Sequence, residues 1–205
     1  MASHAEGYKT EALGEYSHAE GATTIASGNN SHAEGIGTKA QKESSHAEGN
    51  STIADGTSSH AEGAGTKAEG NDSHAEGYWT EAKGAYSHAE GGSTEASGDA
   101  SHAEGFDTTA SNDGSHAEGY YTVASGIASH AEGGGPDDIT KQVTRTIAGV
   151  NHHVRGSTAV GNYSHAEGYQ TFAGGASSHA EGVQTQALGN CSHASGEGTI
   201  AKRDH

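Results

Sequence analysis

The pentapeptide Ser-His-Ala-Glu-Gly recurs through the chain at a fixed interval of 14 residues. The motif begins at Ser3 and at every fourteenth residue up to Ser129, and it returns at Ser164 and Ser178. A last, altered copy begins at Ser192. Such a constant register is typical of stacked repeats, in which every unit contacts equivalent neighbours. We therefore predict an ordered solenoid of 14-residue coils.

Composition alone would favour disorder. Hydrophobic residues make up 30% of the 205 residues, only 17 of them are Leu, Ile, Val or Phe, and the formal net charge is −17. A chain with so little apolar surface ordinarily cannot offset the entropy of folding. Because the repeat holds its register over many units, we expect it to override this composition.

Alternation of residue types predicts two short strands in each coil. In the first half of a coil, small residues such as Ser3 and Ala5 alternate with His and Glu, and in the second half Thr10 and Ala12 alternate with variable residues. A period of two is that of a β-strand. The variable slots should face water, so the Thr and Ala of the second strand and the Ser and Ala of the first should fill a slim interior. The fold class expected is an all-β, parallel β-solenoid.

Glycines should mark the corners of this solenoid. Gly7 and Gly14 are expected to turn the chain where a Cβ would clash. A helical alternative is disfavoured, because each Gly in a helix costs about 1 kcal/mol.

The His and Glu of the motif should face outward, yet they do not vary among the intact copies. Parallel coils stack about 4.8 Å apart, so this face carries one ladder of imidazoles and one of carboxylates. A slim roll also needs a partner for stability. We expect association about a symmetry axis, with His of one chain facing Glu of another. The predicted inter-subunit polar ladder comprises His4, Glu6, His18, Glu20, His32, Glu34, His46, Glu48, His60, Glu62, His74, Glu76, His88, Glu90, His102, Glu104, His116, Glu118, His130, Glu132, His165, Glu167, His179, Glu181 and His193.

Coils such as 17–21 followed by Thr24, Ala26 and Gly28 resemble the repeats in YadA-like heads of trimeric autotransporter adhesins. The resemblance covers most of the chain and implies a left-handed parallel β-roll that forms a homotrimer through its first strand. In that family the two slots between Ser, Ala and Gly are apolar, whereas here they hold His and Glu, which implies a polar contact. The motif also looks like parts of phage tail and neck appendage proteins, which are likewise trimeric and surface-exposed.

These resemblances imply a non-enzymatic structural or adhesive segment of a trimeric surface fibre. The expected location is extracellular, on a cell surface or a virion appendage, with a host-surface protein or a carbohydrate as outside partner. No cofactor is expected. Catalysis is disfavoured because a site repeated in every coil offers no unique nucleophile, base or cleft.

Two alternative functions stay open. The His/Glu ladder can take up Zn²⁺ or Ni²⁺ at a trimer axis, although His and Glu can also satisfy each other without ions. Ice binding would use regular Thr rows facing water, whereas the alternation places Thr10, Thr24 and Thr38 inside the roll.

Charge and hydropathy limit the remaining partners. The net charge of −17 argues against nucleic acid and anionic membranes, both of which need a basic surface. No apolar run approaches the length of a membrane span, and no signal peptide follows Met1, so we expect no membrane insertion and a fragment of a longer protein. The single Cys191 cannot form an intrachain disulfide.

One interruption divides the chain into coils 1–133, an insertion at 134–155, and a degenerate coil with the final coils at 156–205. The insertion adds 21 residues, contains the only Pro, and is rich in β-branched residues, which predicts an added strand or hairpin. It either contacts a partner or braces neighbouring protomers. The residues expected at such a partner contact are Lys141, Arg145, His152, His153 and Arg155.

Aromatic residues gather at the corners of the predicted coils. They form a strip for carbohydrate stacking, or they cover neighbouring corners. Tyr8, Tyr78, Phe106, Tyr120 and Tyr169 follow the motif, and Tyr16, Tyr86 and Tyr163 precede it.

The ladder also predicts a pH dependence with two alternative signs. If His is cationic against Glu, its folded-state pKa rises, and its contribution to stability is full below about pH 6.5 and fades at higher pH. If the imidazoles are neutral and buried, acid destabilises the fold from about pH 6 downward. Greater stability at pH 8 than at pH 6 would exclude the charged pairs.

Overall fold

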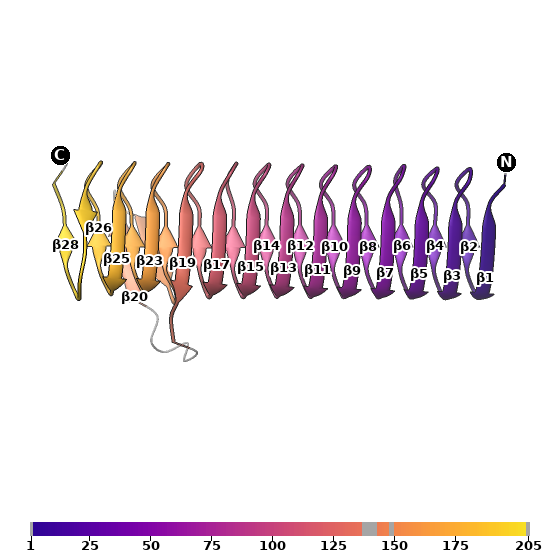
Figure 1. Cartoon of the computed structure of the whole chain (residues 1–205), viewed down its shortest axis with the longest axis horizontal. Coiled ribbons are helices and arrows are strands. Elements are labelled where there is room, and N and C mark those ends of the chain that lie inside the picture. Colours follow the sequence, from indigo (N-terminus) through magenta and orange to yellow (C-terminus); the bar gives the residue numbers. More distant parts are fainter. Residues whose placement is uncertain (1, 137–142, 148–149, 204–205) are drawn as a thin grey trace. The chain divides into compact units, whose positions relative to one another are not determined.

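A computed structural model describes residues 2–136, 143–147 and 150–203, and for the strands between 143 and 154 it describes the backbone alone. The described chain is all-β and winds as a parallel β-solenoid of about 13 turns (Figure 1). It divides into two compact units, unit 1 (Met1–Ala100) and unit 2 (Ser101–His205). None of the described residues lies in a helix capable of crossing a membrane.

Unit 1 contains two parallel sheets, one built from the first strand of each coil and one from the second (Figure 1). The first strands, in sheet order, are β1 (His4–Tyr8), β3 (His18–Ala22), β5 (His32–Ile36), β7 (His46–Asn50), β9 (His60–Ala64), β11 (His74–Tyr78) and β13 (His88–Gly92). The second strands are β2 (Glu11–Ala12), β4 (Ile25–Ala26), β6 (Lys39–Ala40), β8 (Ile53–Ala54), β10 (Lys67–Ala68), β12 (Glu81–Ala82) and β14 (Glu95–Ala96).

Unit 2 repeats this arrangement and adds an antiparallel pair. Its first strands are β15 (His102–Phe106), β17 (His116–Tyr120), β19 (His130–Gly134), β23 (His165–Tyr169), β25 (His179–Val183) and β27 (His193–Ala194). Its second strands are β16 (Thr109–Ala110), β18 (Val123–Ala124), β22 (Thr158–Ala159), β24 (Phe172–Ala173), β26 (Gln186–Ala187) and β28 (Ile200–Ala201). The antiparallel pair is β20 (Val143–Ile147) with β21 (Val150–Val154).

Strand pairing is in register, so each residue lies beside its own equivalent in the next coil. In β3 and β5, for example, His18 pairs with His32 and Glu20 with Glu34. The spacing of about 14 residues agrees with the sequence period. Identical side chains therefore stack in columns within each unit, about 4.8 Å apart.

The interior holds the small side chains that the alternation predicts. Ala19 and Ala26 are fully buried, and Ser17 and Thr24 are at most 2% exposed. The Thr column lies inside as expected, since Thr38 is also fully buried and Thr10 of the first coil is partly buried. These Thr residues thus do not form the water-facing array that ice binding would require.

The buried hydroxyls of the two strands differ in their hydrogen bonding. The motif Ser donates to the carbonyl oxygen three residues earlier, as in Ser17 Oγ to Gly14 O (2.8 Å) and Ser73 Oγ to Gly70 O (2.7 Å). Thr66 Oγ1, in contrast, is buried and makes no hydrogen bond to the described protein. In these coils the Ser column therefore fixes the turn, while the Thr column mainly fills space. The hydroxyls of Ser164, Ser178 and Ser192, in the last coils, make no hydrogen bond to the described protein.

The corners are formed by residues in the left-handed region, at positions that the sequence did not reveal. Lys9, Tyr16, Thr23 and Asn30 have φ between 54° and 62°, so a left-handed residue recurs every seventh position in these coils. The expectation that Gly7 makes a corner is wrong, because Gly7 lies within β1, but the expected Cβ clash is confirmed there and at Gly14, which does lie at a turn. The motif Gly has a different role.

The motif Gly allows consecutive coils to approach closely. Gly35 has φ +110°, and a Cβ built on it would lie 2.1 Å from the carbonyl oxygen of Gly49 in the next coil. No side chain fits such a distance. Gly is therefore required inside the first strand by backbone contact between coils.

The coils continue across the insertion because the chain returns to the point where it left. β18 pairs with β22, and β19 pairs with β23, as consecutive coils would pair if the excursion were absent. A Cβ on Gly135 would lie 1.6 Å from the carbonyl oxygen of Arg155, so both ends of the excursion meet at one corner. Ser157 and Ala159 fill the predicted inward slots of the degenerate coil and are fully buried.

Phe172 departs from the expected pattern. It occupies a variable slot of the second strand, which should face water, yet it is fully buried. Its partner in the adjacent strand, Thr158, is 2% exposed, whereas the equivalent slots of unit 1 are partly or fully exposed. The covered slots lie in the coils that directly follow the excursion, so the outward face of the second sheet is locally an interior surface.

Candidate functional site

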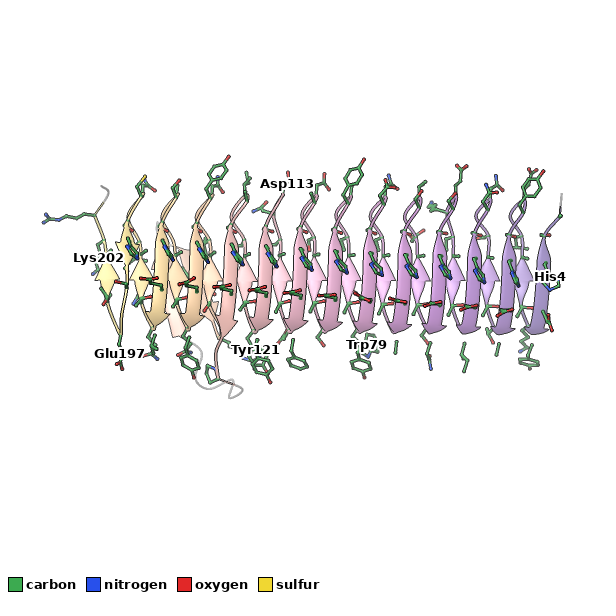
Figure 2. All side chains as sticks on the ribbon, in the orientation of Figure 1. His4, Trp79, Asp113, Tyr121, Glu197 and Lys202 are labelled. Carbon is green, nitrogen blue, oxygen red and sulfur yellow. The ribbon has the colours of Figure 1, made fainter. Side chains whose placement is uncertain are left out.

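The constant His and Glu side chains lie on the outward side of the first strands, between the buried Ser, Ala and Gly positions. We call this surface the His–Glu stripe; it comprises the His and Glu of the motif in each unit, from His4 to Glu90 in unit 1 and from His102 to His193 in unit 2. Figure 2 shows the imidazoles and carboxylates as two rows across the first strands. The structure thus places the predicted ladder residues on one face of each unit.

The imidazole rings of the stripe stack on one another. In unit 1 the ring centroids of His32 and His46 are 4.7 Å apart with planes 3° from parallel, and His46 and His60 repeat these values. In unit 2, His165 and His179 are 4.8 Å apart and 2° from parallel. The end ring, His4, instead meets His18 edge-on at 80°. The last ring of unit 2, His193, stacks on His179 at 5.0 Å and 14°, so the edge-on contact is a feature of the first coil.

Most of the imidazoles also approach a carboxylate of their own chain. His46 Nε2 lies 3.8 Å from Glu48 Oε2 in the same coil, and His74 Nε2 lies 3.7 Å from Glu62 Oε1 in the preceding coil. These distances exceed those of hydrogen bonds. The side chains are about one third exposed, yet the Nε2 atoms of His46 and His74 are buried and make no hydrogen bond to the described protein.

Five imidazoles of the stripe have a lowered pKa, which favours their neutral form. Burial, followed by the charge of neighbouring His46, lowers the pKa of His32, and burial followed by His60 lowers the pKa of His46. The pKa values of His116, His130 and His179 are lowered by burial and adjacent imidazoles in the same way. The nearby carboxylates act in the opposite direction, but burial is the larger effect. This direction matches the neutral-imidazole alternative.

Glu118 of unit 2 is hydrogen-bonded to the carboxylates of neighbouring coils. Hydrogen bonds with Glu132 and Glu104 raise the pKa of Glu118 to about 7. The hydrogen bond from Glu118 in turn lowers the pKa of Glu132. A protonated Glu118 can donate to its ionised neighbours, which relieves the repulsion between like charges stacked in consecutive coils.

The stripe also brings together groups of metal-ligating atoms. His74, Glu76 and His88 each offer one ligand atom, and these atoms lie within 4.8 Å of one another. The same grouping recurs in other coils, so the described residues provide a series of equivalent sites rather than one unique centre.

The predicted partner-contact residues fall mostly outside the part of the chain whose side chains are described. Lys141 lies outside the described residues, and the side chains of Arg145, His152 and His153 are not described. Arg155 is described: its guanidinium lies 3.3 Å from the centre of the Tyr121 ring and 3.4 Å from the carboxylate of Asp107. It therefore ties the end of the excursion to the preceding coils.

Most corner aromatics are exposed rather than covering neighbours. Tyr8, Tyr16 and Tyr78 are 61–66% exposed, whereas Phe106 and Tyr120 stack on each other at 5.2 Å. The covering interpretation thus applies to the last pair alone among these five.

Trp79 was missed by the sequence reasoning. The ring of this single Trp is 60% exposed and projects beside Tyr78 at the corner after β11 (Figure 2). The indole lies over the backbone of Gly65, where a Cβ would be 3.1 Å from the ring. The two aromatics border a hollow of about 270 Å³, lined by Asn50, Ser51, Ala64, Gly65, Tyr78 and Trp79. Its uniqueness in the chain was the signal that could have singled out Trp79.

No known protein family matches the chain, and no curated protein shows significant similarity to it.

Proposed function

We propose that the chain is a non-enzymatic structural segment of a surface fibre, in which three copies associate through the His–Glu stripe. Each copy would be a left-handed roll of 14-residue coils, as the resemblance to YadA-like heads and phage appendage proteins implies. The observation that carries this proposal is the contrast between the constant stripe and the variable slots of the second strand. Selection for solubility alone would not keep His and Glu in every intact coil.

The geometry of a single chain supports the same proposal. The stripe leaves each His and Glu of the inner coils about one third exposed, with side chains held in two regular rows. Regular rows of half-buried donors and acceptors suit a matching surface with the same repeat. A sister chain supplies that repeat, and its approach would complete the burial of the imidazoles.

Light scattering tests the assembly. We expect a solution mass of about three times the 20.5 kDa of one chain. His60→Glu, in the stripe, should lower this mass by bringing like charges together. Lys67→Glu introduces the same side chain on the second strand of the same coil and should leave the mass unchanged. A well-folded monomer of the unaltered chain would refute the proposal.

Carbohydrate binding at the Trp79 hollow is a second candidate function, and the lining of the hollow favours it. Exposed aromatic rings beside amide and hydroxyl groups are suited to stacking and hydrogen bonding with a sugar, and Asn50 and Ser51 line the hollow. Because Trp79 is the only Trp, its intrinsic fluorescence reports on occupancy directly. Titration with a panel of soluble glycans should shift the emission for one class, and Trp79→Ala should abolish binding of that class, measured by calorimetry because the variant lacks the fluorescent ring. An emission spectrum unchanged by every glycan would exclude this hollow as a sugar site.

A further inference from the structure

The distances between the His Nε2 and Glu Oε2 atoms of the stripe are too long for hydrogen bonds but close to those between two ligands of one metal ion. His116 Nε2 lies 3.8 Å from Glu118 Oε2, and His130 Nε2 lies 4.0 Å from Glu132 Oε2. A tetrahedral ion with bonds of about 2.0–2.1 Å separates its ligand atoms by about 3.3 Å. Side-chain rotations that turn the stacked rings of adjacent coils toward a common point would therefore close a coordination shell.

We infer that the stripe binds divalent transition-metal ions such as Zn²⁺ between consecutive coils, each ion held by two imidazoles and one carboxylate. The ligand atoms of His116, Glu118 and His130 lie within 4.8 Å of one another, as do those of His130, Glu132 and His165. The Nε2 atoms of these three His residues are buried and make no hydrogen bond to the described protein. In the tautomer protonated at Nδ1, each of these atoms offers a lone pair to an ion.

Charge and ligand type favour a soft or borderline cation. Stacked carboxylates repel one another, so a dication between coils offsets that repulsion in a chain whose net charge is −17. Imidazole ligands favour Zn²⁺, Ni²⁺ and Cu²⁺ over Mg²⁺ and Ca²⁺, which prefer oxygen ligands throughout. The fourth coordination position faces outward, where water or a further ligand can occupy it.

The repeat imposes a limit on occupancy. His130 belongs to two adjacent groups, but its one Nε2 lone pair can bind a single ion. Drawing the rings of His116 and His130 together from their spacing of 4.7 Å also widens the next gap, toward His165. Adjacent groups therefore exclude each other, and the ions occupy at most alternate gaps.

Calorimetric titration of tag-free protein with ZnCl₂ tests this inference. We expect fewer bound ions than half the number of coils, retention of Zn²⁺ in millimolar Mg²⁺, and the intense visible absorption of tetrahedral Co²⁺ on substitution. His130→Gln/His165→Gln should lower the ion count by about one, because it breaks three adjacent gaps. Asp113→Asn, at an exposed corner of the same unit, should leave the count unchanged (Figure 2).

Three outcomes would overturn the inference. These are no Zn²⁺ uptake at millimolar concentration, one ion for every gap, or an unchanged count in the double variant. Far-UV circular dichroism in the presence of chelator verifies that the variants fold. Light scattering in the same chelator measures assembly separately, so the metal result stands or falls independently of the proposed trimer.

Discussion

Two nearby glycines of the third coil, Gly35 and Gly37, have different structural roles. Gly35 allows the backbones of consecutive coils to meet, whereas Gly37 occupies a left-handed corner that other coils fill with Lys9, Thr23 or Ser51. The close approach tolerates no Cβ, but the corner tolerates many side chains.

We expect Gly35→Ala to destabilise the fold by more than about 2 kcal/mol, because the new Cβ would meet a carbonyl oxygen in the next coil. Gly37→Ser is the matched control. Its Cβ would lie 3.6 Å from the nearest atom, but Gly37 has φ +69°, so we expect the smaller loss of about 1 kcal/mol that a side chain costs in the left-handed region. Thermal denaturation of the two variants measures the difference. Equal melting temperatures would show that the coils do not touch at Gly35.

The buried hydroxyl columns make a second prediction. Ser73→Ala removes the hydrogen bond to Gly70 and should cost about 1 kcal/mol. Thr66→Val keeps the side-chain shape and removes a buried hydroxyl that makes no hydrogen bond to the described protein, so stability should stay the same or rise. Denaturant unfolding compares them. A larger loss in Thr66→Val than in Ser73→Ala would contradict the assignment of the two columns.

At the scale of the element, the excursion is separable from the coils. Its ends meet at Gly135 and Arg155, and the strands on either side pair directly. We predict that deleting residues 135–155 and joining Gly134 to Gly156 leaves the far-UV circular dichroism of the coils intact. The removed segment equals the 21 extra residues, so the 14-residue period is restored.

Loss of the excursion should nevertheless expose Phe172, whose slot is buried only in this region. The deletion variant is therefore expected to melt at a lower temperature than the full chain. Complete unfolding of the deletion variant would show that the excursion is part of the coil core.

Much of the element structure was predictable, because alternation and a fixed period leave few alternatives. The inward Ser, Ala and Thr columns, the degenerate coil at Ser157 and Ala159, and the outward His–Glu face follow from parity alone. The left-handed corners were not predictable, since residues such as Thr23 and Trp79 seldom adopt that conformation. Stacking between coils holds these corner residues in the left-handed conformation. The burial of Phe172 was not predictable either, because it occupies a slot that parity places outward, and the intrachain approach of His to Glu depends on rotamers.

At the scale of the whole molecule, the stripe makes stability depend on pH. The folded-state pKa of His32, His46, His116, His130 and His179 is lowered, so the unfolded chain binds more protons below about pH 6.5 and acid weakens the fold. Glu118 acts oppositely: its pKa of about 7 gives a contribution that is present in acid and is lost as pH rises through that value.

Because five imidazoles shift in one direction, we expect the metal-free protein to melt at a higher temperature at pH 7 than at pH 5. Melting curves in chelator measure this. His46→Gln/His116→Gln should flatten the dependence, since it removes two of the shifted groups. A higher melting temperature at pH 5 would instead indicate charged His–Glu pairs.

The left-handed corners recurring every seventh residue have a further consequence for how such a molecule can change. Lys9, Tyr16, Thr23, Asn30 and Trp79 show that these positions accept basic, aromatic, aliphatic-hydroxyl and amide groups on one backbone conformation. Their side chains stand in evenly spaced lines that the interior does not constrain. Replacing one of these side chains by another changes the exposed surface at almost no cost to folding. The surface can therefore diversify quickly while the coils stay the same.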